Sequence, residues 1–106
     1  MESEILKKMN KRIVNSFMDV LILAKLRNGS MSGYDFIEFI HKKFHMLVSS
    51  GSVYSILYSM ERDGLIEGRW AQRKRVYSLT HKGEETLRAV LNLKEKILGL
   101  IINLFI

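Results

Sequence analysis

The spacing of hydrophobic residues changes once between positions 50 and 79, and this change is the strongest structural signal in the chain. The positions i, i+3, i+4 and i+7 of one helical face are occupied by Val53, Ile56, Leu57 and Met60. From position 65 onward the pattern is that of short strands, first at Leu65 and Ile66 and then at residues 76–79, where side chains alternate between two faces. The sequence therefore predicts a helix followed by a β-hairpin.

Both ends of this helix carry recognisable capping residues. Ser49 or Ser50 can accept a hydrogen bond from an N–H group that has no partner within the first turn. Gly64 follows the last apolar position and can adopt the left-handed conformation that is common just after a helix. We therefore expect the helix to span about residues 50–63.

A helix of the central core is expected at residues 17–26, which are apolar nearly all round. Ser16 and Asp19 have the spacing of a capping box at its start. Asn28 and Gly29 are expected to end it.

The next helix is expected from residue 33 to about residue 44, after a turn in which Ser32 is the capping residue. A short turn at residues 45–48 then leads to the helix at 50–63. Two helices joined in this way form a helix-turn-helix, in which the second helix reads DNA.

The C-terminal segment is predicted to form one long helix over residues 81–106, with Thr80 as its cap. Its apolar residues form two adjacent stripes, and one of them is sufficient for docking on the chain's own core. The second stripe would stay exposed in a monomer, which favours a homodimer. The residues predicted at the dimer interface are Val90, Leu93, Ile97, Leu98, Leu100, Ile101, Leu104 and Phe105.

The segment of residues 1–15 combines helical spacing of apolar residues with several lysines and one arginine. It is interpreted either as an amphipathic helix that packs on the C-terminal helix or as a basic arm that touches DNA. The expected organisation is thus an N-terminal helix or arm at 1–15, a winged-helix domain at 16–80 and a dimerisation helix at 81–106. The fold class is mainly α with a small β-hairpin.

Composition limits the classes of function. The 106 residues carry a formal net charge of +6, which favours a polyanionic partner. The chain has no cysteine, and its apolar C-terminal run is shorter than the roughly 20 residues that a membrane span needs. We therefore expect a cytoplasmic protein that does not enter membranes.

The outward face of the helix at 50–63 and the segment after it are rich in hydroxyl groups and basic groups. Such a helix face suits phosphates and base edges in a major groove, and a basic wing at residues 68–75 suits the DNA backbone or minor groove. The residues predicted to contact DNA are Ser49, Ser50, Ser52, Tyr54, Ser55, Tyr58, Arg62, Arg69, Arg73, Lys74 and Arg75. The alternatives are a solvated hairpin tip, a winged helix that binds proteins, and, less favoured, one that binds RNA or unusual duplexes. Trp70 is interpreted as covering the base of the wing.

Catalytic and metal sites are not indicated. His41 and His45 have a metal-ligand spacing but no further ligand beside them, so no metal or other cofactor is predicted. Acidic pairs such as Asp35 with Glu38 are explained by solvation, because no set of nucleophile, base and orienting group accompanies them. We expect that the protein is not an enzyme.

Three segments resemble the PadR-like family of winged-helix transcriptional regulators. Residues 32–36 resemble the family's Gly-Tyr-acidic entry to its second helix, and residues 75–83 resemble its Arg-x-Tyr-x-Leu-Thr-x-x-Gly segment after the wing. The more specific match is residues 51–66, which resemble the Gly-(Thr/Ser)-Val-Tyr-Pro-x-Leu…Leu-Glu-x-x-Gly-Leu-Ile motif of the recognition helix. Ser55 stands where the family usually has proline, so contacts with DNA are expected to differ while the fold does not.

The resemblance implies a homodimer, held by the C-terminal helix, that binds double-stranded DNA at a pseudo-palindromic operator, usually as a repressor. It also implies that a small-molecule effector, unidentified from the sequence, binds some members at the dimer interface. The single tryptophan, Trp70, lies in the wing. A pocket built around a tryptophan of the last helix is therefore not expected.

Overall fold

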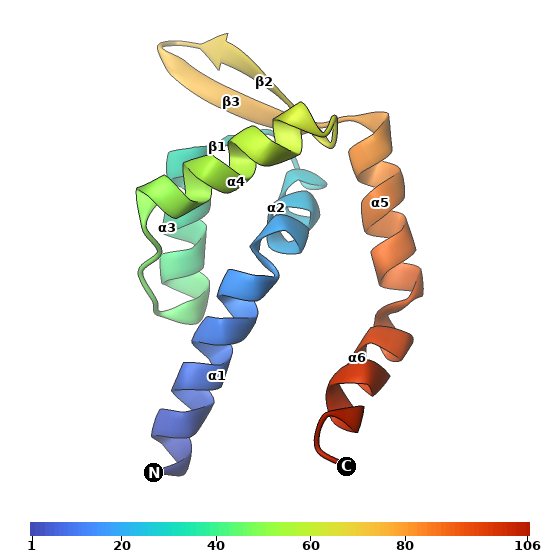
Figure 1. Cartoon of the computed structure of the whole chain (residues 1–106). Helices are drawn as coiled ribbons and strands as arrows, with labels where there is room; N and C mark the ends of the chain where they lie inside the picture. The colour runs from blue at the N-terminus through green and yellow to red at the C-terminus, as the bar shows by residue number, and fades with distance from the viewer.

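Six helices and three short strands follow one another along the chain in the computed structural model, which describes residues 1–106. Figure 1 shows the hairpin β2–β3 (residues 66–79) at one end of the molecule, while the helices α1 (Glu2–Ser16) and α6 (Lys94–Asn103) run away from it toward the two termini. The elements are α1 (Glu2–Ser16), α2 (Met18–Leu26), β1 (Met31–Ser32), α3 (Gly33–Phe44), α4 (Ser50–Arg62), β2 (Ile66–Ala71), β3 (Lys74–Leu79), α5 (His81–Asn92) and α6 (Lys94–Asn103).

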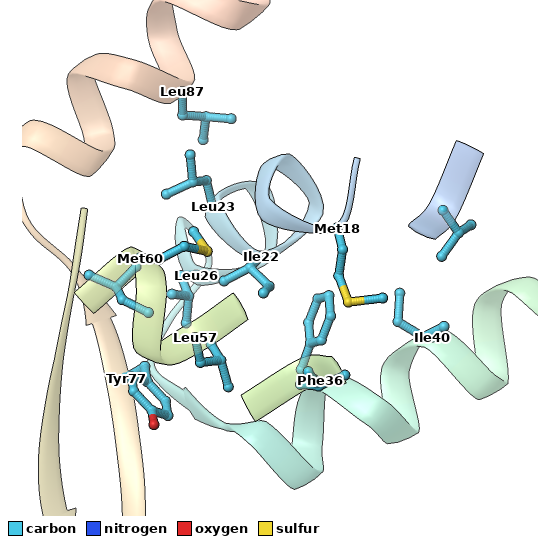
Figure 2. Packing of buried hydrophobic residues seen from close by; sticks show 13 residues of the cluster. Met18, Ile22, Leu23, Leu26, Phe36, Ile40, Leu57, Met60, Tyr77 and Leu87 are labelled. Carbon is cyan, nitrogen blue, oxygen red and sulfur yellow. The ribbon is translucent and has the colours of Figure 1, made fainter. Parts of the chain in front are cut away.

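The core is built around the apolar face of α4, as the spacing predicts. Val53, Leu57 and Met60 are all buried, and α4 packs against α2, α3 and β2. Figure 2 shows side chains of α2 and α3, including Ile22 and Phe36, directed into the same cluster. Full burial of each such side chain contributes roughly 1.5–3 kcal/mol to folding. The helix-turn-helix is therefore held by its own core.

The sheet has three strands in the order β1-β3-β2, with both neighbouring pairs antiparallel. The sequence predicts only the hairpin, and the residues of β1 were expected to be a turn. No local periodicity can identify a two-residue strand, because it forms only through pairing with the distant β3, Met31 opposite Tyr77 and Ser32 opposite Val76.

The hairpin of β2 and β3, residues 66–79, is called the wing below. Its strands reach nearly to the tip, so that most of segment 68–75 is paired strand, whereas the sequence indicates strands only at residues 65–66 and 76–79. The connection is the two-residue turn Gln72-Arg73, and both residues have positive φ, 49° and 68°. Such turns match the right-handed twist of the paired strands.

Three of the predicted helix caps are confirmed. The Ser49 and Thr80 side chains accept hydrogen bonds from the N–H groups of Ser52 and Gly83, respectively. Ser32 accepts from the Asp35 N–H while the Asp35 carboxylate accepts from the Ser32 N–H, both at 3.1 Å, which completes a capping box.

The capping box predicted at Ser16 and Asp19 is wrong. Ser16 is the last residue of α1, and α2 begins two residues later at Met18 without a side-chain cap. The N–H of Phe17 bonds to the carbonyl of Ile13, and the carbonyl of Phe17 accepts from the N–H of Leu21. Backbone bonding thus runs almost continuously through the junction, so Ser16 has no unpartnered helix start to cap.

The single long C-terminal helix is also wrong, because α5 and α6 are separated at Leu93. This residue has φ −101° and ψ 7°, and its N–H group is shared by the carbonyls of Ala89 and Val90. Only α5 is anchored to the core, through the buried Leu87, whereas no residue of α6 is buried. Neither glycine nor proline marks the break, and the apolar spacing continues across it, so the sequence alone indicates one helix.

Residues Glu2–Ser16 form the helix α1, and only Val14 of this helix is buried. Its remaining large apolar residues are exposed, namely Ile5, Leu6, Met9 and Ile13. No helix in the chain combines the length and the hydropathy that crossing a bilayer requires.

Gly83 provides a test of how the first turn of α5 packs against Leu65, in the segment between α4 and β2. A Cβ atom at this position would lie 2.0 Å from the backbone oxygen of Leu65, whereas a Cβ at Gly51 would meet nothing within 4 Å. Because the obstacle at Gly83 is backbone, we predict that Gly83→Ala lowers the free energy of unfolding by about 1–3 kcal/mol. Gly51→Ala, also in a helix, should leave it unchanged or raise it. Chemical denaturation at equal protein concentration measures both, and equal stability of the two variants would contradict the described packing.

Candidate nucleic-acid interface

The face of α4 opposite the core carries small hydroxyl groups, two tyrosines and one arginine. Tyr54 and Tyr58 are 44% and 67% exposed, although Val53 and Leu57 beside them are buried. Ser49 organises the first turn, since its hydroxyl lies 2.8 Å from that of Ser52 and accepts from the Ser52 N–H. This face is therefore preformed on a rigid helix and open to solvent.

The C-terminal end of α4 is fixed to the elements that follow it. Gly64 has φ 77°, and the N–H groups of Gly64 and Leu65 bond back to the carbonyls of Glu61 and Met60. The Lys82 ammonium donates to the carbonyl of Asp63 at 2.7 Å, which also places a positive charge at the negative end of the helix. The end of α4 is consequently connected both to the wing and to α5.

One carboxylate of α4 reaches the wing directly. Glu61 Oε2 lies 2.7 Å from Arg75 Nη2 and accepts a hydrogen bond from the N–H of Gly68 at 3.2 Å. The side chains of Glu61 and Arg75 are only 29% and 32% exposed. The Glu61 carboxylate thus joins α4 to both strands of the wing.

The structure brings the candidate DNA-contacting residues together on α4 and the adjoining wing. All of them are exposed except Arg75, which is half-buried against Glu61. Arg73 lies in the tip turn and Lys74 starts β3. Arg62 lies beside the Tyr58 ring, with its guanidinium carbon 5.7 Å from the ring centre.

Two aromatic side chains at this interface are absent from the residues that the sequence singles out for DNA contact. Tyr34, in the first turn of α3, is 65% exposed. Trp70 does not cover the base of the wing: it lies one residue pair from the turn, opposite Arg75, and is 72% exposed. The alternation of β2 places Trp70 on the same face as the buried Ile66, but the position lies beyond the core, and local spacing does not reveal this.

Tyr54 lies against the start of α3. A Cβ at Gly33 would be 2.6 Å from Cε1 of the Tyr54 ring. Glycine at position 33 therefore allows Tyr54 to lie across this helix start. In the Gly-Tyr pair of residues 33 and 34, the glycine thus makes room for Tyr54, and the tyrosine presents an exposed ring.

Hydrogen bonding and burial shift two pKa values near this interface. Hydrogen bonds from the backbone and the side chain of Ser32 lower the pKa of Asp35 below its usual 3.8. Burial raises the pKa of the Tyr77 hydroxyl, and the negative charge of Glu61 acts in the same direction. At neutral pH Asp35 is therefore ionised and Tyr77 is neutral.

Metal ligands are not gathered here or elsewhere in residues 1–106, where no group of three or more histidine or acidic side chains could hold an ion. His45 lies at the end of α3 with φ 53°, so the helical spacing to His41 is not maintained.

A helix-turn-helix formed by α3 and α4, followed by a basic two-stranded wing, defines the winged-helix class of DNA-binding proteins. Within this class, the model of the transcriptional regulator PadR-like family matches residues 22–89, well over half of the chain. The chain therefore belongs to the PadR-like family of transcriptional regulators. None of the curated proteins matches the sequence.

Solved structures agree with this fold. A PadR family transcriptional regulator from Eggerthella lenta is similar with a TM-score of 0.78 at 18% identity, covering 98% of this chain and 95% of that one. A transcriptional regulator from Clostridium thermocellum gives 0.74 at 21% identity, covering 90% and 95%. Bacillus subtilis PadR, solved in complex with operator DNA, gives 0.63 at 26% identity, covering 70% of this chain and 46% of that one.

Proposed function

We propose that this protein is a sequence-specific repressor that binds a pseudo-palindromic operator as a homodimer. In this proposal α4 enters the major groove, and the wing lies along the backbone or in the minor groove beside it. The observation that carries the proposal is that the hydroxyl-rich and aromatic face of α4 adjoins a wing with three exposed basic residues, Arg69, Arg73 and Lys74. Bacillus subtilis PadR binds operator DNA, which supports the same role here.

Charge on the two elements agrees with this proposal. The one acidic side chain that joins α4 to the wing, Glu61, is paired with Arg75. The positive charges at the tip have no such partner among the ion pairs of the chain. A DNA backbone beside the tip would therefore meet uncompensated positive charge, which supplies affinity that does not depend on sequence.

The homodimer is proposed from the exposed apolar residues at the other end of the molecule. The exposed side chains of α1 include Leu6 at 70%, and those at the C-terminal end include Leu104 at 81% and Phe105 at 83%. Apolar surface of this kind, on two segments at the same end of the molecule, marks an interaction site (Figure 1). A second copy covers the same faces symmetrically and presents two α4 helices to two half-sites.

The first prediction concerns contact of the wing tip with phosphate. Arg73→Ala should weaken binding to specific and random duplexes alike, and it should reduce the slope of log affinity against log salt by about 0.9, as expected for one lost phosphate contact. Arg88→Ala removes the same charge from an exposed position in α5 and serves as the matched control. Fluorescence anisotropy with labelled duplexes at several salt concentrations measures both slopes. An unchanged slope for Arg73→Ala would contradict contact between the tip and DNA.

The second prediction concerns the dimer. Leu98 is 56% exposed on α6, and Leu98→Glu would place a carboxylate in each half of an apolar interface. Each dimer of this variant carries two such carboxylates. We expect each of them to raise the dissociation constant of the dimer about 10-fold or more. Tyr58→Glu, on the exposed face of α4, should leave the dimer intact while it abolishes DNA binding.

Sedimentation velocity without DNA measures this second prediction. An unmodified chain that is monomeric, or a Leu98→Glu variant that remains dimeric, would contradict the proposed interface. A monomer that binds no DNA would instead favour the winged helix as a protein-interaction module.

A further inference from the structure

Glu61 is an anionic residue on an element that we propose binds a polyanion. On the same helix Tyr58 and Arg62 are exposed, whereas Glu61 is half-buried and directed at the wing. Its Oε2 atom receives two donors, Arg75 Nη2 from β3 at 2.7 Å and the Gly68 N–H from β2 at 3.2 Å. A single carboxylate oxygen thus holds both strands of the wing against α4.

Arg75 reaches Glu61 by passing over position 68, which has no side chain. Gly68 lies opposite Tyr77 in the register, and Arg75 extends along the same face of the sheet to pass over it. A Cβ at Gly68 would lie 2.8 Å from Nε and 2.9 Å from Cζ of Arg75. The absence of a side chain at Gly68 therefore makes room for the Arg75 side chain. This observation is independent of the hydrogen bonds that Glu61 accepts.

The contacts of Arg75 differ from those of the other basic residues of the wing. Its guanidinium is engaged by Glu61 and lies 5.8 Å from the ring centre of Trp70. Arg75 is half-buried and held by an ion pair, whereas Arg69, Arg73 and Lys74 are exposed. Charge-assisted hydrogen bonds of this length are stronger than neutral ones and fix the geometry of the groups they join.

We propose that Glu61 is a positioning residue for DNA recognition: through Arg75 and Gly68 it fixes the wing relative to the recognition helix, so that both meet one duplex at once. Arg75 then acts through this pairing and not as a phosphate contact. This inference rests on the proposed DNA-binding function. It implies that an acidic residue near the DNA strengthens specific binding, which is opposite to the effect of its charge alone.

The test compares two glutamates of equal charge. Glu67 follows Ile66 in β2, is exposed and takes no part in these contacts. Glu61→Ala and Glu67→Ala each remove one negative charge, so simple electrostatics predicts equal or tighter DNA binding for both. We expect Glu67→Ala to follow this rule, and we expect Glu61→Ala to bind a duplex selected from random sequences at least about 5-fold more weakly, with its preference over random duplexes reduced.

A third variant displaces Arg75 without changing any charge. Gly68→Ala would place its methyl group where the flexible guanidinium now lies, so the arginine should move while the strand keeps its conformation. We expect the same loss of specific binding as for Glu61→Ala. If Glu61→Ala does not fold, as judged by circular dichroism, Gly68→Ala alone decides the result.

A second readout reports on the wing without DNA. Trp70 is the single tryptophan of the chain and lies in the wing opposite Arg75. Time-resolved fluorescence anisotropy of Trp70 should show greater local mobility in Glu61→Ala and Gly68→Ala than in Glu67→Ala. A change in stability alone would not produce this increase in a folded protein.

The outcomes separate this inference from the proposed function. Binding by Glu61→Ala that equals or exceeds that of Glu67→Ala would overturn the positioning role while binding by the unmodified chain stays intact. Unchanged Trp70 mobility in both Glu61→Ala and Gly68→Ala would overturn it as well. Failure of the unmodified chain to bind any duplex would overturn the proposed function and with it the role in recognition. Weaker binding together with a more mobile Trp70 supports the inference.

Discussion

The burial of one face of α4 is the interaction on which the rest of this structure depends. Val53, Leu57 and Met60 are all less than 5% exposed, and they hold α4 against α2, α3 and β2. Because the same helix is only 13 residues long, burial of one face determines which residues point outward. The open face with Tyr54 and Tyr58 is therefore a direct consequence of core packing.

The two ends of the molecule carry different kinds of surface. The wing end is basic and hydroxyl-rich, and it is connected to α4 by the Glu61–Arg75 pair and by the Gly64 turn. At the opposite end, α1 and α6 expose apolar side chains, and neither helix is closely tied to the core (Figure 1). The proposed function uses both ends. A dimer formed through the apolar end would set the distance between the two wing ends and their α4 helices.

Most of the winged helix could be predicted from the sequence because its signals are local. The spacing of apolar residues predicts α3 and α4, and the caps at Ser32, Ser49 and Thr80 are each recognised within four residues of sequence. The features that were missed depend on distant parts of the chain. The strand β1 exists only through pairing with β3, and the contact of Arg75 joins residues 14 positions apart.

The errors at the ends of the chain have a similar origin. Helical spacing continues through Ser16 and through Leu93, but it does not report where a helix changes direction. Val14 is the buried residue of α1, and Leu87 is the last buried residue of α5. From these residues toward the two termini no buried side chain fixes the course of the helices, so the apolar spacing does not predict it. Of the 11 residues singled out for the candidate site, 10 are exposed and Arg75 is engaged in a partly buried ion pair, while their contact with DNA stays a prediction.

The most direct measurement is the selection of bound sequences from random duplex DNA, followed by footprinting of the selected duplex at two salt concentrations. The account predicts a two-fold symmetric site whose half-sites lie about one helical turn apart, with protection that persists at the higher salt. Binding without sequence preference that disappears as salt is added, or no binding at all, would contradict a sequence-specific dimeric regulator.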